Sequence, residues 1–216
     1  MAERDRLVAA EPGKVHAMLP EARPAADELY AVVLDKIAGL PGFRVAGGGV
    51  TRPDGVTVRL DADQPLLTLG RLIQEDLCLM ETGAGGHRLT GAILCFPASW
   101  TLAQKIGRPL MGIHQGVVPY SDDVGRRVQR MFDAVRVDQP LWRMNVLTYD
   151  DHLLHQPRLE GQRRPRPVGH FYVRSERQCF VRLPGTRAVL FSIHTYVVRA
   201  ETLTAEELAA LRDAVH

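Results

Sequence analysis

The spacing of apolar residues divides the first part of the chain into helical and irregular segments. Residues 21–39 carry apolar side chains at helical spacing and end at Gly39, which predicts a helix. Residues 41–65 are rich in Gly, Pro and Asp and predict an irregular hairpin. A short helix is expected to begin near Pro65, where an apolar run follows.

Five later segments have the apolar clustering and turn-rich borders that are typical of β-strands. A Gly-rich connection joins the first two as a hairpin, and a Pro-Gly-Thr turn joins the last two. A helical zone broken by Pro109 separates the second strand from the third and continues into a helix over 121–135. The five predicted strands are 75–82, 88–97, 141–149, 170–183 and 187–199.

The order strand, strand, helices, strand, strand, strand predicts an α+β fold. It is the order of a PAS domain, in which a five-stranded antiparallel sheet cradles a ligand beneath helices packed over one face. N-terminal and C-terminal helices flank this unit. The predicted division is 1–64 for the N-terminal helix and hairpin region, 65–200 for the PAS-like domain, and 201–216 for the C-terminal helix.

Composition places the chain among ordinary globular proteins. Its 216 residues are 45% hydrophobic and 24% charged, and the formal net charge of +2 is too small to predict a nucleic-acid partner.

No run approaches the roughly 20 apolar residues of a membrane span, so neither a membrane nor a secretory signal is expected and a cytoplasmic location is predicted. Three isolated cysteines without a CxxC pair exclude a zinc ribbon or a cysteine-ligated iron–sulfur cluster within the chain.

A block of polar residues, 174–178, interrupts the fourth predicted strand. Strand alternation places Arg174, Glu176 and Gln178 on one face, and Ser175 and Arg177 on the other. A solvated outer face explains only one of these two sets. If Arg177 lies on the core face, it requires a counter-charge. The acidic candidates for that role are Glu75 and Asp76.

Two histidines occupy positions from which a ring can enter a pocket. His114 follows the helical zone, and its ring is either a core group bonded to backbone or a neutral imidazole available to a metal. His194 shares a strand face with Ser192 and Tyr196, which is either a solvated face or the lining of a pocket.

Five motifs together carry a resemblance to a known family. They are QEDLCLM (74–80), CFPASWTLAQKIGRPLMGIH (95–114), RMNV (143–146), RSERQCFVRLP (174–184) and LFSIHTY (190–196). In this order they resemble the haem-bearing alpha subunit of the haem-dependent oxidative N-demethylases, over roughly residues 65–200. The resemblance implies a PAS-like domain that binds haem b non-covalently through a histidine. It also implies oxidation of a small secondary amine such as dimethylamine by dioxygen, with release of formaldehyde.

The resemblance assigns roles to individual residues. His114 becomes the first candidate for the axial ligand of the haem iron and His194 the second. Lys105 and Arg108 are candidates to pair with the haem propionates.

The resemblance also assigns pocket roles to two residues of the last two predicted strands. Glu176 is predicted to hold an alkylammonium substrate or to support the pocket, and Tyr196 to hydrogen-bond iron-bound oxygen. Arg177 is predicted to be a buried structural cation paired with an acidic residue, on the strand face opposite Glu176.

The resemblance also implies a partner. NADPH, FMN and an iron–sulfur cluster belong to a separate reductase subunit that supplies electrons. One alternative stays open at this point: a PAS-like module that binds haem or another small ligand for sensing, without turnover. Two stretches of the chain depart from the family pattern. They are HQGVVPY, which begins at His114, and Asn145-Val146, which follows the motif arginine.

Overall fold

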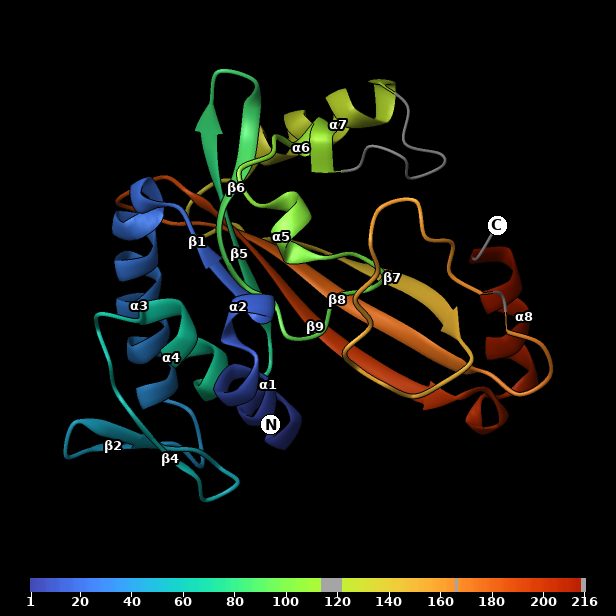
Figure 1. Ribbon diagram of the computed structural model, residues 1–216, viewed down its shortest axis with the longest axis horizontal. Coiled ribbons are helices and arrows are strands. Elements are labelled where there is room, and N and C mark those ends of the chain that lie inside the picture. Colours follow the sequence, from blue (N-terminus) through green and yellow to red (C-terminus); the bar gives the residue numbers. More distant parts are fainter. Residues whose placement is uncertain (114–121, 166, 215–216) are drawn as a thin grey trace.

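The computed structural model describes residues 1–113, 122–165 and 167–214 (Figure 1). Within these residues, a six-stranded antiparallel sheet has the strand order β1-β6-β5-β9-β8-β7. Its strands are β1 (His16–Met18), β5 (Asp76–Gly83), β6 (Gly86–Ile93), β7 (Leu141–Tyr149), β8 (Tyr172–Arg182) and β9 (Val189–Arg199). The fold is therefore α+β, as predicted.

The five predicted strands, β5 to β9, lie next to one another in this sheet. The sixth strand, β1, was not predicted and pairs with β6 at the edge, with His16 opposite Ile93. Three residues are too few to show alternation, so this strand left no pattern in the sequence. Because β1 comes from residues 1–64, the N-terminal region contributes to the main sheet, and the predicted division of the chain stays a prediction.

The N-terminal region consists of short helices and a second sheet. The predicted helix over 21–39 and the helix at Pro65 are confirmed, whereas the predicted hairpin is a three-stranded sheet in the order β2-β3-β4. The helices are α1 (Ala2–Ala10), α2 (Pro12–Val15), η1 (Pro20–Ala22), α3 (Arg23–Ala38) and α4 (Pro65–Leu72). The small strands are β2 (Arg44–Ala46), β3 (Gly49–Thr51) and β4 (Thr57–Arg59).

One face of the main sheet, the α3–α4 face, packs against these N-terminal helices (Figure 1). Leu79 and Leu190 are opposite one another in the register and are buried there. A Cβ atom on Gly70 of α4 would lie 2.4 Å from Cγ1 of Ile93. Only glycine permits helix α4 to approach the sheet this closely.

The opposite face, the α5–α7 face, is covered by α5 (Leu102–Lys105), α6 (Leu110–Ile113) and α7 (Asp122–Ala134). The aromatic ring of Phe132 meets Phe180 edge-on at 5.2 Å, and Phe180 stacks on Phe191 at 5.0 Å. Val128 and Met131 of α7 pack against the same cluster, so one apolar side of this helix faces the sheet.

Helix α7 is fastened to the β5–β6 hairpin by a pair of hydrogen bonds. The backbone N–H of His87 donates to Oε1 of Gln129 at 3.0 Å, and Nε2 of Gln129 donates to Nδ1 of His87 at 2.9 Å. Gly86 has φ +93°, and a Cβ atom there would lie 2.5 Å from the Gln129 oxygen. Burial lowers the pKa of His87, so its ring is a neutral acceptor at pH 7.

The chain ends with η2 (Ala200–Thr202) and α8 (Ala205–Ala214). Figure 1 shows α8 at the end of the molecule remote from α3. Across the described ranges, each helix is too short or too polar to cross a bilayer.

Candidate functional site

The polar block of β8 divides as alternation predicts, and its buried half faces helices α5–α7. Arg174 is 1% exposed and Glu176 is 4% exposed. Nε of Arg174 donates to Oε1 of Glu176 at 3.1 Å, and its two Nη atoms donate to the carbonyl oxygens of Leu154 at 2.8 Å and Phe96 at 2.5 Å. The buried half of the block therefore contains an ion pair, Arg174–Glu176, and distant backbone carbonyl groups accept the remaining hydrogen bonds of Arg174.

The prediction that Arg177 is a buried cation is wrong. Its side chain is 48% exposed and lies on the strand face opposite Glu176. The predicted counter-charge is partly confirmed, because Nη2 of Arg177 is 3.7 Å from Oε1 of Glu75. The buried position belongs to Arg174 instead, because the carbonyl groups that satisfy a buried guanidinium lie on its side of the sheet.

His194 and Tyr196 lie together on the α3–α4 face. Nδ1 of His194 is 3.2 Å from Oε1 of Glu75, and the His194 and Tyr196 ring centroids are 4.5 Å apart. Burial raises the pKa of Glu75, but the hydrogen bond and charge of His194, a backbone hydrogen bond and the charge of Arg177 together leave that pKa lowered. The sheet thus separates His194 and Tyr196 from Glu176, and the structure does not bring these three predicted site residues together.

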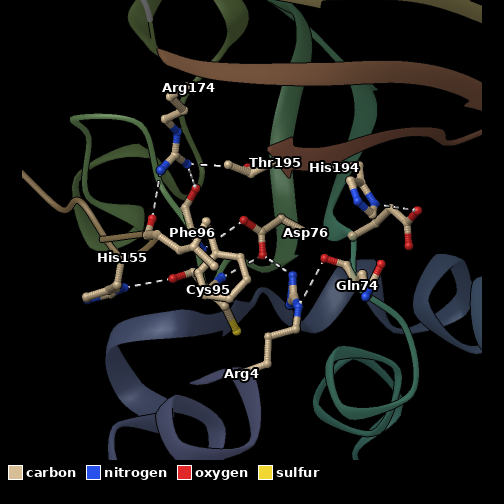
Figure 2. A network of polar contacts seen from close by, with 11 residues as sticks. Arg4, Gln74, Asp76, Cys95, Phe96, His155, Arg174, His194 and Thr195 are labelled. Atoms are coloured by element: carbon tan, nitrogen blue, oxygen red, sulfur yellow. Dashed lines mark hydrogen bonds and ion pairs between the residues drawn. The ribbon is translucent and has the colours of Figure 1, made fainter. Parts of the chain in front are cut away.

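A second buried ion pair, which the sequence did not reveal, supports the first (Figure 2). Arg4 of α1 pairs with Asp76 of β5, and both side chains are fully buried. Asp76 also accepts from the backbone N–H groups of Cys95 at 2.7 Å and Phe96 at 2.9 Å. Burial raises the pKa of Asp76, and Arg4 and the two amides oppose that rise.

Phe96 joins these two pairs, because its N–H binds Asp76 and its carbonyl oxygen binds Arg174. Arg4 and Asp76 are 72 positions apart, so no local pattern could have indicated their contact. The network links α1, β5, β8 and the segment after β6 through hydrogen bonds and ion pairs (Figure 2).

A cleft of about 510 Å³ opens beside this network on the α5–α7 face. Thr195 and Val197 of its wall are the register partners of Glu176 and Arg174. The wall combines aliphatic and aromatic surface with one imidazole and one guanidinium, and the volume is typical of small-molecule sites. Its lining residues are His152, Leu154, Tyr172, Thr195, Val197 and Arg199.

His152 is the histidine that the described structure places in this cleft, with its ring 5.6 Å from that of Tyr172. The leading sequence candidate, His114, lies outside the described residues. In the ranges 1–113, 122–165 and 167–214, no group of three or more His, Cys, Asp or Glu side chains is arranged to hold a metal ion.

Lys105 and Arg108, the residues predicted to pair with haem propionates, lie close together and both bind a carboxylate of the chain itself. Nζ of Lys105 donates to Oε1 of Glu160 at 2.6 Å, and Nη1 of Arg108 donates to the same oxygen at 2.8 Å. Lys105 also donates to the carbonyl oxygen of Ile113 at 2.5 Å. The hydrogen bond from Lys105 and the two positive charges lower the pKa of Glu160.

These features define an α+β protein with a ligand-sized cleft over one face of an antiparallel sheet, and with two cations, Lys105 of α5 and Arg108 just after it, that bind one carboxylate. Comparison with protein families matches the description "Haem-dependent oxidative N-demethylase, alpha subunit-like" over residues 1–216. The chain belongs to this family. The match extends beyond the motif region, residues 65–200, and includes the N-terminal helices that carry Arg4.

Proposed function

We propose that this chain is the haem-bearing subunit of an oxidative N-demethylase that acts on a small secondary amine such as dimethylamine. The observation that carries the proposal is the cleft on the α5–α7 face in a chain of this family. The five adjacent antiparallel strands beneath α5–α7 support the PAS-like arrangement in which such a sheet cradles a ligand. The cleft residues suit a flat apolar macrocycle that carries carboxylates, because they offer apolar walls, imidazole and guanidinium.

Haem b, when bound, would supply the activation of dioxygen, by which an N-methyl group is oxidised to formaldehyde and the demethylated amine. The chain would hold the haem non-covalently through one histidine. His114 is the first candidate from the family motif, and His152 is the histidine in the described cleft. His194 is the weakest of the three, because the sheet lies between it and the cleft.

Glu176 is the carboxylate available to a cationic substrate on this face. Its Oε1 atom is neutralised by Arg174, whereas Oε2 accepts from neutral amides, Nε2 of Gln178 at 3.0 Å and Nδ2 of Asn145 at 3.4 Å. An alkylammonium makes a stronger bond to a carboxylate than an amide does. We therefore assign the substrate nitrogen to Oε2 of Glu176, with displacement of the weakly held Asn145.

The role predicted for Tyr196 in the haem pocket requires a ring on the cleft side of the sheet. In the described structure the ring lies on the α3–α4 face and is 44% exposed. A role for Tyr196 in the proposed reaction is thus a prediction that its substitution by phenylalanine tests. Unchanged formaldehyde release in Tyr196→Phe would remove it from the catalytic set.

Electrons for the reaction would come from NADPH through FMN and an iron–sulfur cluster on a separate reductase subunit. The family description names an alpha subunit, which supports a multi-subunit assembly. In the proposed balance, one secondary amine, one dioxygen, one NADPH and one proton give one formaldehyde, one demethylated amine, one water and one NADP⁺.

The test has two stages. First, the purified chain is titrated with hemin and the Soret band is recorded for wild type, His114→Ala and His152→Ala. Loss or shift of the band in one variant identifies the ligand, and absence of a band in the wild type rejects the proposal. Second, formaldehyde release from dimethylamine is measured with oxygen and a chemical reductant. Haem binding without formaldehyde from any small methylated amine would favour a sensory or binding module.

A further inference from the structure

The segment that follows β7 lies across helix α5 as a strap, defined here as residues 150–165. Three alternate strap residues bind α5 and the segment that leads into it. The bonds join Gln156 O to Ser99 N at 2.9 Å, Arg158 O to Thr101 Oγ1 at 2.7 Å, and Glu160 N to Gln104 Oε1 at 3.0 Å. Glu160 is the last residue of this series, and Gly161 follows it with φ +84°.

The strap also forms one wall of the cleft. His152 and Leu154 line the cleft, and the carbonyl oxygen of Leu154 accepts a hydrogen bond from the buried Arg174. The first part of the strap is therefore anchored on the core, whereas the part that ends at Glu160 is anchored on α5 and on two cations. The second anchor is the one that can be released without disturbing the core.

The two cations outnumber the carboxylate that they share. Lys105 is 5% exposed and Arg108 is partly exposed, and both bind the same oxygen of Glu160. The three groups together carry one net positive charge. A buried ammonium requires an anionic partner or water, so Lys105 and Arg108 favour a carboxylate at this position from whatever source.

Glu160 is a replaceable source. Its side chain is about one third exposed, so water competes with the two cations for its carboxylate oxygens. It also lies on an irregular segment, whose ordering costs conformational entropy. A carboxylate carried by a rigid ligand loses less entropy when it binds.

We propose that Lys105 and Arg108 form the binding site for one haem propionate, and that Glu160 fills this site as an internal substitute until the propionate displaces it. The inference rests on the proposed function. Haem loading then releases the Glu160 end of the strap from α5, and the strap stays attached through Leu154. Glu160 lowers the apparent affinity for haem because it competes for the same two cations.

Trypsin provides a readout that is independent of activity. Arg158 and Arg163 are cleavable strap residues, whereas Arg164 precedes Pro165 and resists trypsin. Cleavage at Arg158 and Arg163 is followed by mass spectrometry with no additive, with hemin, and with hemin dimethyl ester, which lacks free carboxylates. The proteins are wild type, Glu160→Gln, and the control Glu206→Gln, which alters an exposed carboxylate of α8.

Hemin is expected to accelerate strap cleavage in wild type about tenfold, the effect of losing one charge-assisted bond. The diester should have no such effect. Glu160→Gln should be cleaved rapidly before hemin is added, should show little further acceleration, and should bind hemin several-fold more tightly. Glu206→Gln should behave as wild type.

Three results would overturn the inference. A Soret band with unchanged cleavage shows that Glu160 stays in place, and it leaves the proposed function intact. Equal acceleration by the diester shows that displacement requires no carboxylate. Absence of a Soret band in every protein rejects the proposed function and the inference with it, so the spectrum separates this failure from the other two.

Discussion

The molecule contains two clusters in which cations meet carboxylates, and they differ in burial and in what holds them. In the first cluster, Arg4–Asp76 and Arg174–Glu176 are joined through Phe96 and are almost fully buried. In the second, Lys105 and Arg108 share the carboxylate of Glu160, which is about one third exposed. The first cluster uses four elements of the fold, and the second uses a helix and an irregular strap.

The difference separates a structural network from an exchangeable one. Removing one partner of a buried pair leaves a charge that neither water nor protein satisfies, which costs about 3–5 kcal/mol. Removing one partner of an exposed pair costs little, because water takes its place. The first cluster therefore holds the walls of the cleft in place. In the second cluster, Lys105 and Arg108 can exchange the carboxylate of Glu160 for that of a ligand.

The largest effect is expected from Asp76→Ala. This change leaves the buried guanidinium of Arg4 without its counter-charge and leaves the N–H groups of Cys95 and Phe96 without an acceptor. The free energy of unfolding should fall by about 3–5 kcal/mol, measured by urea denaturation with circular dichroism. The exposed Asp63→Ala is the control and should change stability by less than about 0.5 kcal/mol. A loss below about 1 kcal/mol at Asp76 would show that the first cluster is not structural.

A somewhat smaller effect is expected from Arg174→Met, about 3 kcal/mol. The thioether fills part of the space but leaves Glu176 as an uncompensated buried carboxylate. Adding Glu176→Gln to this variant should restore stability, because the charge is removed with its partner. The double-mutant cycle should give a coupling of at least about 1 kcal/mol. Strictly additive losses would mean that the two side chains contribute separately.

Much of the fold could be predicted, because its longer elements have regular patterns. All five long strands and helices α3, α4 and α7 were expected at nearly their observed positions. Helix α1 and strand β1 were not. Helix α1 has no strong apolar stripe, and its buried residues include Arg4, whose partner is supplied by tertiary structure.

The candidate site was predictable only up to the choice between two faces. Alternation correctly separated Arg174 and Glu176 from Arg177. It could not say which set is buried, because that depends on carbonyl groups of residues 96 and 154, far away in the sequence. The pairing of Lys105 and Arg108 with Glu160 was hidden for the same reason, since Glu160 lies 55 positions from Lys105.

The third prediction concerns the pH dependence of stability. His87 is buried as a neutral ring, unlike the buried ion pairs of the first cluster. Burial lowers the pKa of this histidine in the folded state, so the unfolded chain binds its proton more readily. The contribution to stability is complete above the unfolded pKa of about 6.5 and is lost as pH falls toward the lower folded value. Urea denaturation of wild type should therefore show declining stability from pH 7.5 to 5.5.

The variant His87→Gln should reduce this decline, and the remainder is expected from His16, whose pKa is also lowered by burial. Gln129→Ala is the matched control. It removes the contact with His87 but keeps the buried ring, so it should lower stability at every pH and preserve the decline. An unchanged decline in His87→Gln would assign the pH dependence to other groups.

The smallest effect on stability is expected from Glu160→Gln, and it tests the second cluster directly. The same change from carboxylate to amide, made as Asp76→Asn, alters the first cluster at a fully buried position. Glu160→Gln should lower the free energy of unfolding only slightly, because the strap that pairs with Lys105 also shields it, and release of the strap lets water reach the ammonium. Asp76→Asn should cost several times more, because Arg4 has no comparable access to water.

Adding 1 M NaCl should reduce the smaller loss further and leave the larger one nearly unchanged, since salt screens exposed pairs much more than buried ones. Equal losses at the two positions would mean that Glu160 is as firmly held as Asp76, and a firmly held carboxylate could not give way to a propionate.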